Sequence, residues 1–251
     1  MAATEAGARL TERHRTAQLA LRTQLVRDLL RIWPVFDSAD ITASWAKLEP
    51  VLVAMVQARF PMSARIAATY LPEFRRAEGI AGSVLPAMPD TPLADLVVPN
   101  LRYVGPMNAF RLTNLGRPAS EVTRTTLVNI EGELTRQVLA GGRDTVVETV
   151  RRDRRARGFS RVTDGQPCSF CAMLAGRGPV YSESGAGFEA HRKCGCTGEP
   201  VYFTDAPLSP SAQRWSSLYA EAASAVPTNA PDWAAEVRRE FRRRYEAPAT
   251  T

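Results

Sequence analysis

The stretch CSFCAMLAGRGPVYSESGAGFEAHRKCGC, from Cys168 to Cys196, contains all four cysteines of the 251-residue chain and one of its two histidines. Its spacing is Cys168-x2-Cys171, then nineteen residues, then His191-x2-Cys194-x-Cys196. A C-x2-C turn places two sulfurs on one side of a tight turn. A second pair from a distant loop completes a tetrahedron of the kind that zinc accepts with sulfur and imidazole ligands. The spacing therefore predicts a metal-binding knuckle.

Five candidate ligands exceed the four that zinc takes in structural sites. We expect Cys168, Cys171, His191 and Cys194 to bind one structural zinc ion, with Cys196 able to replace His191 or Cys194. The segment between the two pairs is rich in Gly, Ser and Ala, so it needs a metal or another staple to hold its shape. Two disulfides are the alternative if the protein meets oxidising conditions.

The same region repeats a short motif. Gly178-Pro179-Val180-Tyr181 follows the first cysteine pair, and Glu199-Pro200-Val201-Tyr202 follows the second. Each motif enters an extended stretch directly after a metal-type turn. The repetition predicts two short strands that lie side by side across the knuckle.

Before the knuckle, apolar residues recur every three or four positions, which is typical of amphipathic helices. The first predicted helix covers residues 10–36 and places His14 on its polar, solvated face. Asp40 belongs to a capping segment for the next helix, which Pro61 should break before a third helix ends near residue 78. A later helix is capped by Ser120 and stopped by Gly141-Gly142, and Asp144 starts a short successor.

The sequence thus predicts a mainly α-helical protein with a small zinc-knuckle-like α+β module and a C-terminal helical tail. In the tail, Trp215 and Trp233 each begin an apolar helix face. The expected divisions are an N-terminal helical region (1–78), a Gly- and Pro-rich linker (79–93), central helices (94–157), the knuckle module (158–206) and the tail (207–251).

The chain is basic, with a net charge of +6 and a pI near 9.5, and nearly all of the positive charge is arginine. Such a balance suits contact with nucleic acid or acidic protein surfaces, although solvated helix ends give the same pattern. The expected DNA contacts lie in two basic runs: Arg151, Arg152, Arg154, Arg155, Arg238, Arg239, Arg242 and Arg243. We expect no membrane partner, because no stretch has the ~20 apolar residues that crossing a bilayer takes.

A thiol protease is the alternative to a metal-stapled assembly protein. It needs a cysteine thiolate beside a histidine base, and Cys168 or Cys171 with His191 is the candidate pair. A serine version would use Ser182 or Ser184 with Glu183 or Glu189 as the orienting acid. Four cysteines at ligand spacing favour the metal, since a catalytic dyad needs only one.

The strings GFSRVTDGQPCSFCAMLAGRGPVY and FEAHRKCGC resemble the C-terminal module of the phage Mu F-like minor head proteins, in the version found in tailed phages of actinobacteria. The matching positions are the five candidate ligands, preceded by Asp164. The signature covers about fifty residues, and the helical N-terminal part fits the family in general character. Many relatives carry arginine between the last two cysteines, where this chain has Gly195, so a role for that arginine does not transfer.

The resemblance implies a minor capsid protein of head morphogenesis, present in the virion and in the host cytoplasm during assembly. It implies the portal protein and the major capsid protein as partners, at the portal or the inner capsid, during procapsid assembly, DNA packaging or ejection. Some members of the family are described as capsid maturation proteases, which keeps the enzyme alternative open.

Overall fold

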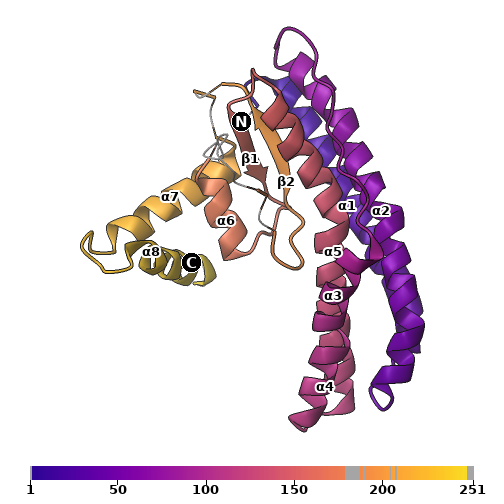
Figure 1. The fold of residues 1–251 in the computed structure, drawn as a ribbon. Helices are drawn as coiled ribbons and strands as arrows, with labels where there is room; N and C mark the ends of the chain where they lie inside the picture. The colour runs from indigo at the N-terminus through magenta and orange to yellow at the C-terminus, as the bar shows by residue number, and fades with distance from the viewer. Residues whose placement is uncertain (1, 179–186, 189, 204, 207, 248–251) are drawn as a thin grey trace.

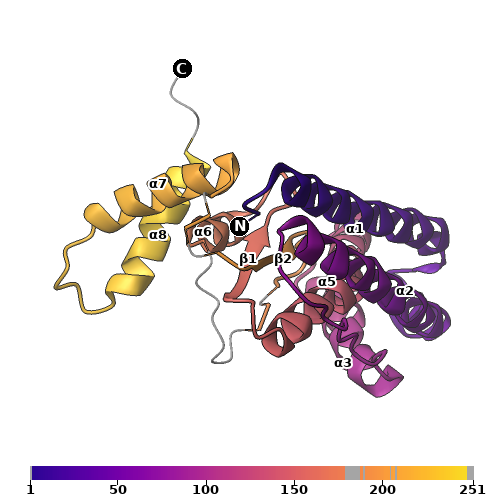
Figure 2. The same cartoon turned by 90° about the horizontal axis from the view of Figure 1, so that it is seen from above.

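The computed structural model describes residues 2–178, 187–188, 190–203, 205–206 and 208–247. Long helices form a bundle, a smaller helical lobe lies apart from it, and two strands lie between them (Figures 1 and 2). The predicted fold class, mainly α with two short strands, is confirmed. The elements in chain order are α1 (Glu5–Ile32), the 3-10 turn η1 (Trp33–Val35), α2 (Ile41–Ala77), α3 (Ala94–Val104), α4 (Pro106–Asn114), α5 (Ala119–Arg152), β1 (Gly158–Val162), α6 (Ser169–Gly176), β2 (Thr197–Val201), α7 (Pro210–Ser224) and α8 (Trp233–Glu246).

The bundle consists of α1, α2 and α5, with α3 and α4 packed along its far end (Figure 1). Thr4 caps α1 by accepting from the Gly7 amide, and Asp40 caps α2 by accepting from the Ala43 amide, as the sequence predicted for Asp40. Leu25, Leu52 and Leu134, one from each long helix, belong to the larger apolar cluster of the core, and a second cluster of α2 and α5 residues includes Phe74 and Val146.

The predicted break at Pro61 is wrong, because α2 continues through Pro50, Pro61 and Pro72. Each proline removes a backbone donor and costs about 3 kcal/mol in a helix interior. Packing on both sides outweighs that local cost: α2 lies between α1 and α5 and buries Leu52, Phe60 and other residues along its length.

The predicted stop at Gly141-Gly142 is also wrong, and so is the separate helix starting at Asp144. Both glycines lie inside α5, which begins after Pro118 at the N-cap position, not after Ser120. A Cβ on Gly141 would lie 2.3 Å from the Phe60 carbonyl oxygen, and the Gly142 amide donates to Ser63 Oγ at 2.9 Å. The glycine pair therefore lets α5 approach α2 closely instead of ending the helix.

His14 is buried, with 3% of its surface exposed, so its predicted solvated position is wrong. Its ring stacks on Tyr70 with centroids 4.4 Å apart, and its Nε2 lies 3.3 Å from Gln18 Nε2. Burial lowers the pKa of His14 to about 3. The helix face that seemed polar in the sequence is an internal contact between α1 and α2.

The two strands form an antiparallel pair in which Gly158 lies opposite Val201 and Val162 lies opposite Thr197. The second predicted strand is confirmed, since Glu199, Pro200 and Val201 belong to β2. Its partner among the described residues is β1, a segment that the sequence analysis assigned no strand. Residues 179–181 of the first predicted strand lie outside the described residues.

Segments at the start of the chain tie α1 to the sheet and to the end of α2. The amide of Ala2 donates to Glu199 Oε1 at 2.9 Å, and the amide of Ala3 donates to Glu78 Oε2 at 2.8 Å. Thr11 of α1 donates to the second oxygen of Glu199 at 2.5 Å. Both carboxylates are buried, so these hydrogen bonds supply the partners that buried charges require.

The tail forms α7 and α8, which pack with α6 into a separate apolar cluster. The two predicted apolar faces of the tail meet there, since Trp215 of α7 and Phe241 of α8 both belong to that cluster. The residues between α2 and α3 form neither helix nor strand from Ile80 to Leu93.

One helix among the described residues, α2, is long and apolar enough to cross a membrane by length and composition. Its most apolar window is 44% buried inside the protein. In the bundle α2 is the central helix, in contact with both α1 and α5, which is the position of a core helix.

Candidate metal centre

The first cysteine pair lies at the start of α6. Cys168 is the N-cap residue, and its sulfur accepts from the amide of Cys171 at 3.4 Å. Cys171 follows in the first turn and is buried, whereas Cys168 is exposed. An N-terminal helix turn with a free amide directed at sulfur favours a thiolate. The local geometry therefore suits both metal binding and thiol chemistry.

The second group lies on the turn from His191 to Cys194, which leads directly into β2. Lys193 in this turn has a φ of 68°, a left-handed conformation that is uncommon for a residue other than glycine. Its amide donates to the Gly132 carbonyl of α5 at 3.1 Å, and a Cβ on Gly132 would lie 2.8 Å from Lys193 Cγ. Close docking on α5 thus holds the turn in its strained conformation.

The fold brings all five predicted ligands together around Cys171. Cys171 Sγ lies 3.3 Å from His191 Nε2 and 3.5 Å from Cys194 Sγ, and Cys168 Sγ lies 2.7 Å from the same His191 nitrogen. Two overlapping groups result, one of Cys168, Cys171 and His191 and one of Cys171, Cys194 and Cys196. Within each group all donor atoms lie within 4.8 Å of one another, so the cluster can hold a metal ion.

The hydrogen bond of the other His191 nitrogen supports a ligand role. His191 Nδ1 lies 2.6 Å from the Arg192 carbonyl oxygen, which only a protonated Nδ1 can contact favourably. In the neutral imidazole, which is the form that binds metals, Nε2 then faces the sulfurs with its lone pair. A backbone carbonyl that fixes the tautomer is the usual outer partner of a metal-binding histidine.

The sulfurs and the imidazole shift one another's pKa values. Hydrogen bonding from Cys171, together with His191, lowers the pKa of Cys168 to about 4, and the Cys168 sulfur raises the pKa of His191 to about 9. Hydrogen bonds with Cys171 and Cys196 lower the pKa of Cys194 as well. Cys168 and Cys194 thus favour the charged form of sulfur, which is the form that binds metals, whereas hydrogen bonds with Cys168, Cys194 and Cys196 raise the pKa of Cys171.

Two buried arginines lie beside the cluster, and the sequence analysis missed both. Arg143 of α5 donates through Nε to the Cys196 carbonyl at 2.9 Å and through Nη2 to the Cys194 carbonyl. Arg161 of β1 has its Nη1 3.8 Å from the sulfurs of both Cys171 and Cys194. The spacing of Arg143 from Leu139 and Val147 puts it on a buried helix face, and that signal was present in the sequence.

Asp164 contacts the backbone between the last two cysteines, at Gly195. Its Oδ2 accepts from the Gly195 amide at 3.1 Å and lies 3.8 Å from Arg22 of α1. A Cβ on Gly195 would lie 2.6 Å from this oxygen, so a larger residue here would have to displace the Asp164 carboxylate. The residue between the last two cysteines therefore contacts Asp164 through its backbone.

The cluster opens into a cleft of about 560 Å³, which Arg22, Asp164, Arg192 and Lys193 also line. All four cysteines are unbonded, and the sulfurs of Cys171 and Cys194 are 3.5 Å apart, well beyond the ~2.05 Å of a disulfide. The serine alternative falls on Ser182, Ser184, Glu183 and Glu189, which lie outside the described residues.

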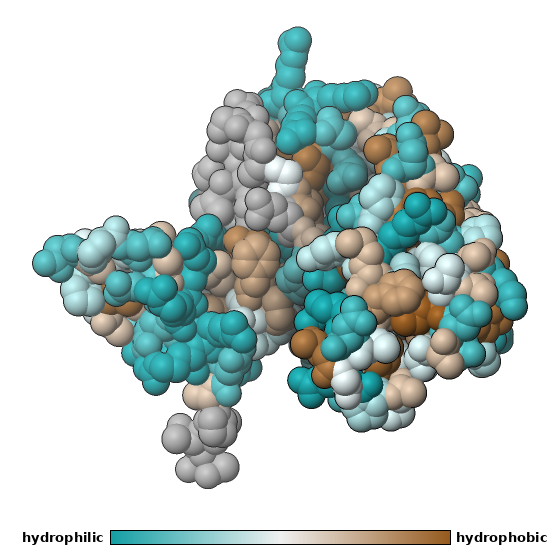
Figure 3. All heavy atoms as spheres, turned by 60° about the horizontal axis from the view of Figure 1, so that its bottom comes forward, coloured by the Kyte–Doolittle hydropathy of each residue, from teal (hydrophilic) through white to brown (hydrophobic). Residues whose placement is uncertain are grey.

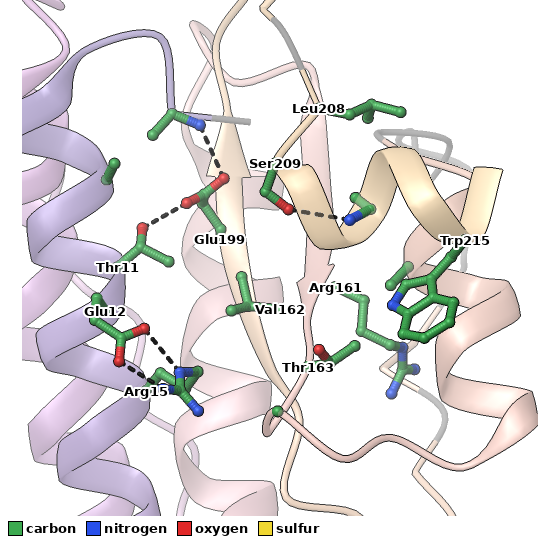
Figure 4. A pocket seen from close by; sticks show the side chains of 15 residues that line it. Thr11, Glu12, Arg15, Arg161, Val162, Thr163, Glu199, Leu208, Ser209 and Trp215 are labelled. Carbon is green, nitrogen blue, oxygen red and sulfur yellow. Dashed lines mark hydrogen bonds and ion pairs between the residues drawn. The ribbon is translucent and has the colours of Figure 1, made fainter. Parts of the chain in front are cut away.

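A second cavity, of about 500 Å³, lies between α1, the sheet and the start of α7 (Figure 4). Several of its polar groups bond to one another: Glu12 accepts from Arg15 at 2.5 Å and 2.8 Å, and Glu199 accepts from Thr11. These polar groups are therefore already bonded to one another, which makes this cavity a weaker candidate site than the cysteine cluster.

A family model for the VG15 protein matches residues 5–222, from the first turn of α1 to the last turns of α7. The chain belongs to the VG15 protein family. This is a viral family of phage proteins, and the match includes every candidate ligand and both buried arginines. Neither the curated proteins nor the solved structures gave a match. Membership in the VG15 family supports a phage protein associated with the virion.

Proposed function

We propose that this VG15 protein is a minor capsid protein of head morphogenesis that acts at the portal or the inner capsid during procapsid assembly, DNA packaging or ejection. The observation that carries the proposal is the five-residue Cys/His cluster, docked on a helical bundle in a phage protein family. In this proposal the cluster is a structural zinc site, and the partners are the portal protein and the major capsid protein.

Two separations between donor atoms lie close to those of a zinc tetrahedron. Zn–S distances of about 2.3 Å and Zn–N distances of about 2.0–2.1 Å separate neighbouring donors of a tetrahedron by about 3.6–3.8 Å. The Cys171–Cys194 and Cys171–His191 separations of 3.5 Å and 3.3 Å fall within a few tenths of an ångström of these values. Cys168 lies closer to His191, at 2.7 Å, and its exposed side chain has room to move outward.

We assign Cys168, Cys171, His191 and Cys194 as the ligands and Cys196 as the spare thiol. Four protein ligands leave no open position, so the ion supplies structural cross-linking and not hydrolysis. Cys171 joins α6 to the site, His191 and Cys194 join the turn before β2, and Arg143 fixes that turn to α5. Together these residues attach the sheet and α6 to the bundle.

The far end of the bundle offers a surface for a protein partner. Six large apolar side chains around α3 and α4 are between 44% and 67% exposed: Leu93, Leu96, Tyr103, Met107, Phe110 and Leu115. Figure 3 views the molecule with this end brought forward and shows hydrophobic side chains there, while the lobe of α7 and α8 is mostly hydrophilic. Exposed apolar patches of this kind mark protein–protein contacts in soluble proteins.

Metal analysis of the purified protein tests the zinc site. We expect about one zinc ion per chain in the wild type, loss of zinc in Cys171→Ser, and retention in the matched control Cys196→Ala. Loss from Cys196→Ala with retention in His191→Ala would place Cys196 in the fourth position instead. A wild-type protein that folds without metal would contradict the proposal.

The virion role has its own test. The protein should be found by mass spectrometry in purified particles, in few copies, and should co-purify with portal protein expressed beside it. Substituting Phe110→Asp on the apolar surface should weaken that co-purification while leaving zinc content unchanged. A protein that is absent from particles would contradict the assignment to the capsid.

A capsid maturation protease is the second candidate, and one observation favours it. Cys168 and His191 are in hydrogen-bond contact at 2.7 Å beside an open cleft, and the pKa of Cys168 is lowered to about 4. A thiolate beside an imidazolium is the arrangement of thiol proteases. This candidate predicts that Cys168→Ser stays folded but stops cleavage of co-expressed major capsid protein, and that an alkylating reagent labels Cys168 alone.

A further inference from the structure

The last residue of α5 and the turn that follows it, before β1, present four arginines to solvent: Arg152, Arg154, Arg155 and Arg157. We call these four residues the arginine turn. All four are exposed, and no ion pair joins any of them to an acid among the residues that the structure describes. Arg151, the fifth arginine of the run, differs because it pairs with Glu148 at 2.5 Å.

The backbone of the arginine turn is rigidly anchored. Asp153 is buried and accepts from the Arg155 amide at 3.0 Å, from Arg75 Nε at 2.9 Å and from the Tyr202 hydroxyl at 3.1 Å. The Arg157 amide donates to the Val201 carbonyl at 2.7 Å, which fixes the other end of the turn to β2. The arginines thus extend from a fixed platform, so little backbone entropy is lost when they bind.

The second basic run, on α8, is arranged differently. Arg239 lies 3.8 Å from Glu236, Arg242 lies 2.9 Å from Glu246, and Arg243 lies 2.6 Å from Glu240. Each pair is spaced three or four residues apart along one helix face. A partner's anion would have to compete with these carboxylates, so α8 is the weaker candidate for anion contact although it carries five arginines.

We propose that the arginine turn contacts the sugar–phosphate backbone of duplex DNA without reading its sequence. Guanidinium groups bind phosphate oxygens in a bidentate manner, and duplex DNA presents about one charge per 1.7 Å of axis. The arginine turn does not include any residue of the cysteine cluster. Of the two basic runs, it is the one that we propose as the DNA-binding surface.

The composition of the turn favours DNA over an acidic protein. Its two residues that are not arginine, Asp153 and Ala156, are buried, so the exposed side chains of the turn are charged. A protein interface needs apolar or aromatic anchors at its centre. Sequence-independent DNA binding needs only positive charge at fixed positions.

Fluorescence anisotropy with a 30-bp duplex of scrambled sequence tests the proposal, with titrations at several salt concentrations. The variant replaces the arginine turn by glutamine (R152Q, R154Q, R155Q, R157Q). The matched control makes four equivalent changes on α8 (R238Q, R239Q, R242Q, R243Q), so both proteins lose the same net charge. The double variant R154Q, R155Q provides a milder change if the fourfold variant does not fold.

We expect the turn variant to bind DNA at least about 10-fold more weakly at low salt. Its slope of log Kd against log salt should be flatter by up to about 3.6, because each of the four neutralised phosphates contributes about 0.9. The α8 variant should keep most of the wild-type affinity and slope. Equal losses of DNA affinity in both variants would show that only the net charge matters, and this result would overturn the proposal. Equally tight binding of the wild type to poly-glutamate, or no binding to DNA, would overturn it too.

Discussion

Replacing Arg143 with methionine tests whether a buried arginine fixes the cysteine cluster to the bundle. The side chain is 2% exposed and donates to the carbonyls of Cys194 and Cys196. Burial lowers the pKa of Arg143, and the charges of Cys194 and Cys196 oppose that effect. Methionine fills much of the same volume but donates no hydrogen bond, so both carbonyls lose their partner.

The magnitude follows from two opposing contributions. Each hydrogen bond from a charged donor contributes about 1.5–3 kcal/mol, so two such bonds account for about 3–6 kcal/mol. Removing the guanidinium also removes the cost of burying its charge, which offsets part of the loss. We therefore expect Arg143→Met to lower the free energy of unfolding by about 2–4 kcal/mol.

Urea unfolding of the zinc-loaded protein measures this change. The matched control is Arg151→Met on the same helix, whose side chain is 39% exposed and pairs with Glu148. That variant should stay within about 0.5 kcal/mol of the wild type. If Arg143→Met were as stable as the wild type and kept its zinc, the cost of burying the guanidinium would outweigh its bonds and our reasoning would be refuted.

Two further predictions concern the bundle. The pKa of His14 is lowered to about 3 by burial, so the unfolded chain binds the extra proton below pH ~6.5 and stability should fall by about 2–3 kcal/mol from pH 6.5 to 4.5. His14→Phe, which keeps the stack on Tyr70, should flatten this part of the pH profile in thermal unfolding, and an unchanged profile would argue against a neutral buried imidazole. Gly141→Ala should destabilise by about 1–3 kcal/mol in urea, although alanine favours helices, because its Cβ meets the Phe60 carbonyl oxygen; a more stable variant would show that α2 and α5 can separate at little cost.

The approach of the four cysteines and His191 to one another was predictable because the spacing within each pair is a local property of the sequence. Cys168-x2-Cys171 and His191-x2-Cys194 each specify a turn that brings two donors together, and few other structures need that pattern. The long helices were predictable for a similar reason, since apolar residues three and four apart define one helix face.

The features that the sequence analysis got wrong depend on neighbours that are distant in sequence. Gly141 resembles a helix stop until Phe60 of α2 is known to press against it. His14 resembles a solvated side chain until Tyr70 is known to cover it. Pro61 resembles a break because its local cost is visible in the sequence, whereas the packing that outweighs it comes from two other helices. Local patterns therefore located the candidate site better than they located helix ends.

The way in which the tail lobe is attached has a consequence for the whole molecule. Both α7 and α8 pack on α6, where the backbone of Trp215 lies so near Gly176 that a Cβ there would be 2.6 Å from it. The Tyr245 hydroxyl donates to the Pro167 carbonyl, one residue before the first cysteine. The tail lobe thus joins the rest of the molecule through α6, the same helix whose first turn carries Cys168 and Cys171, so a displacement of that helix would move the lobe and half of the cysteine cluster together.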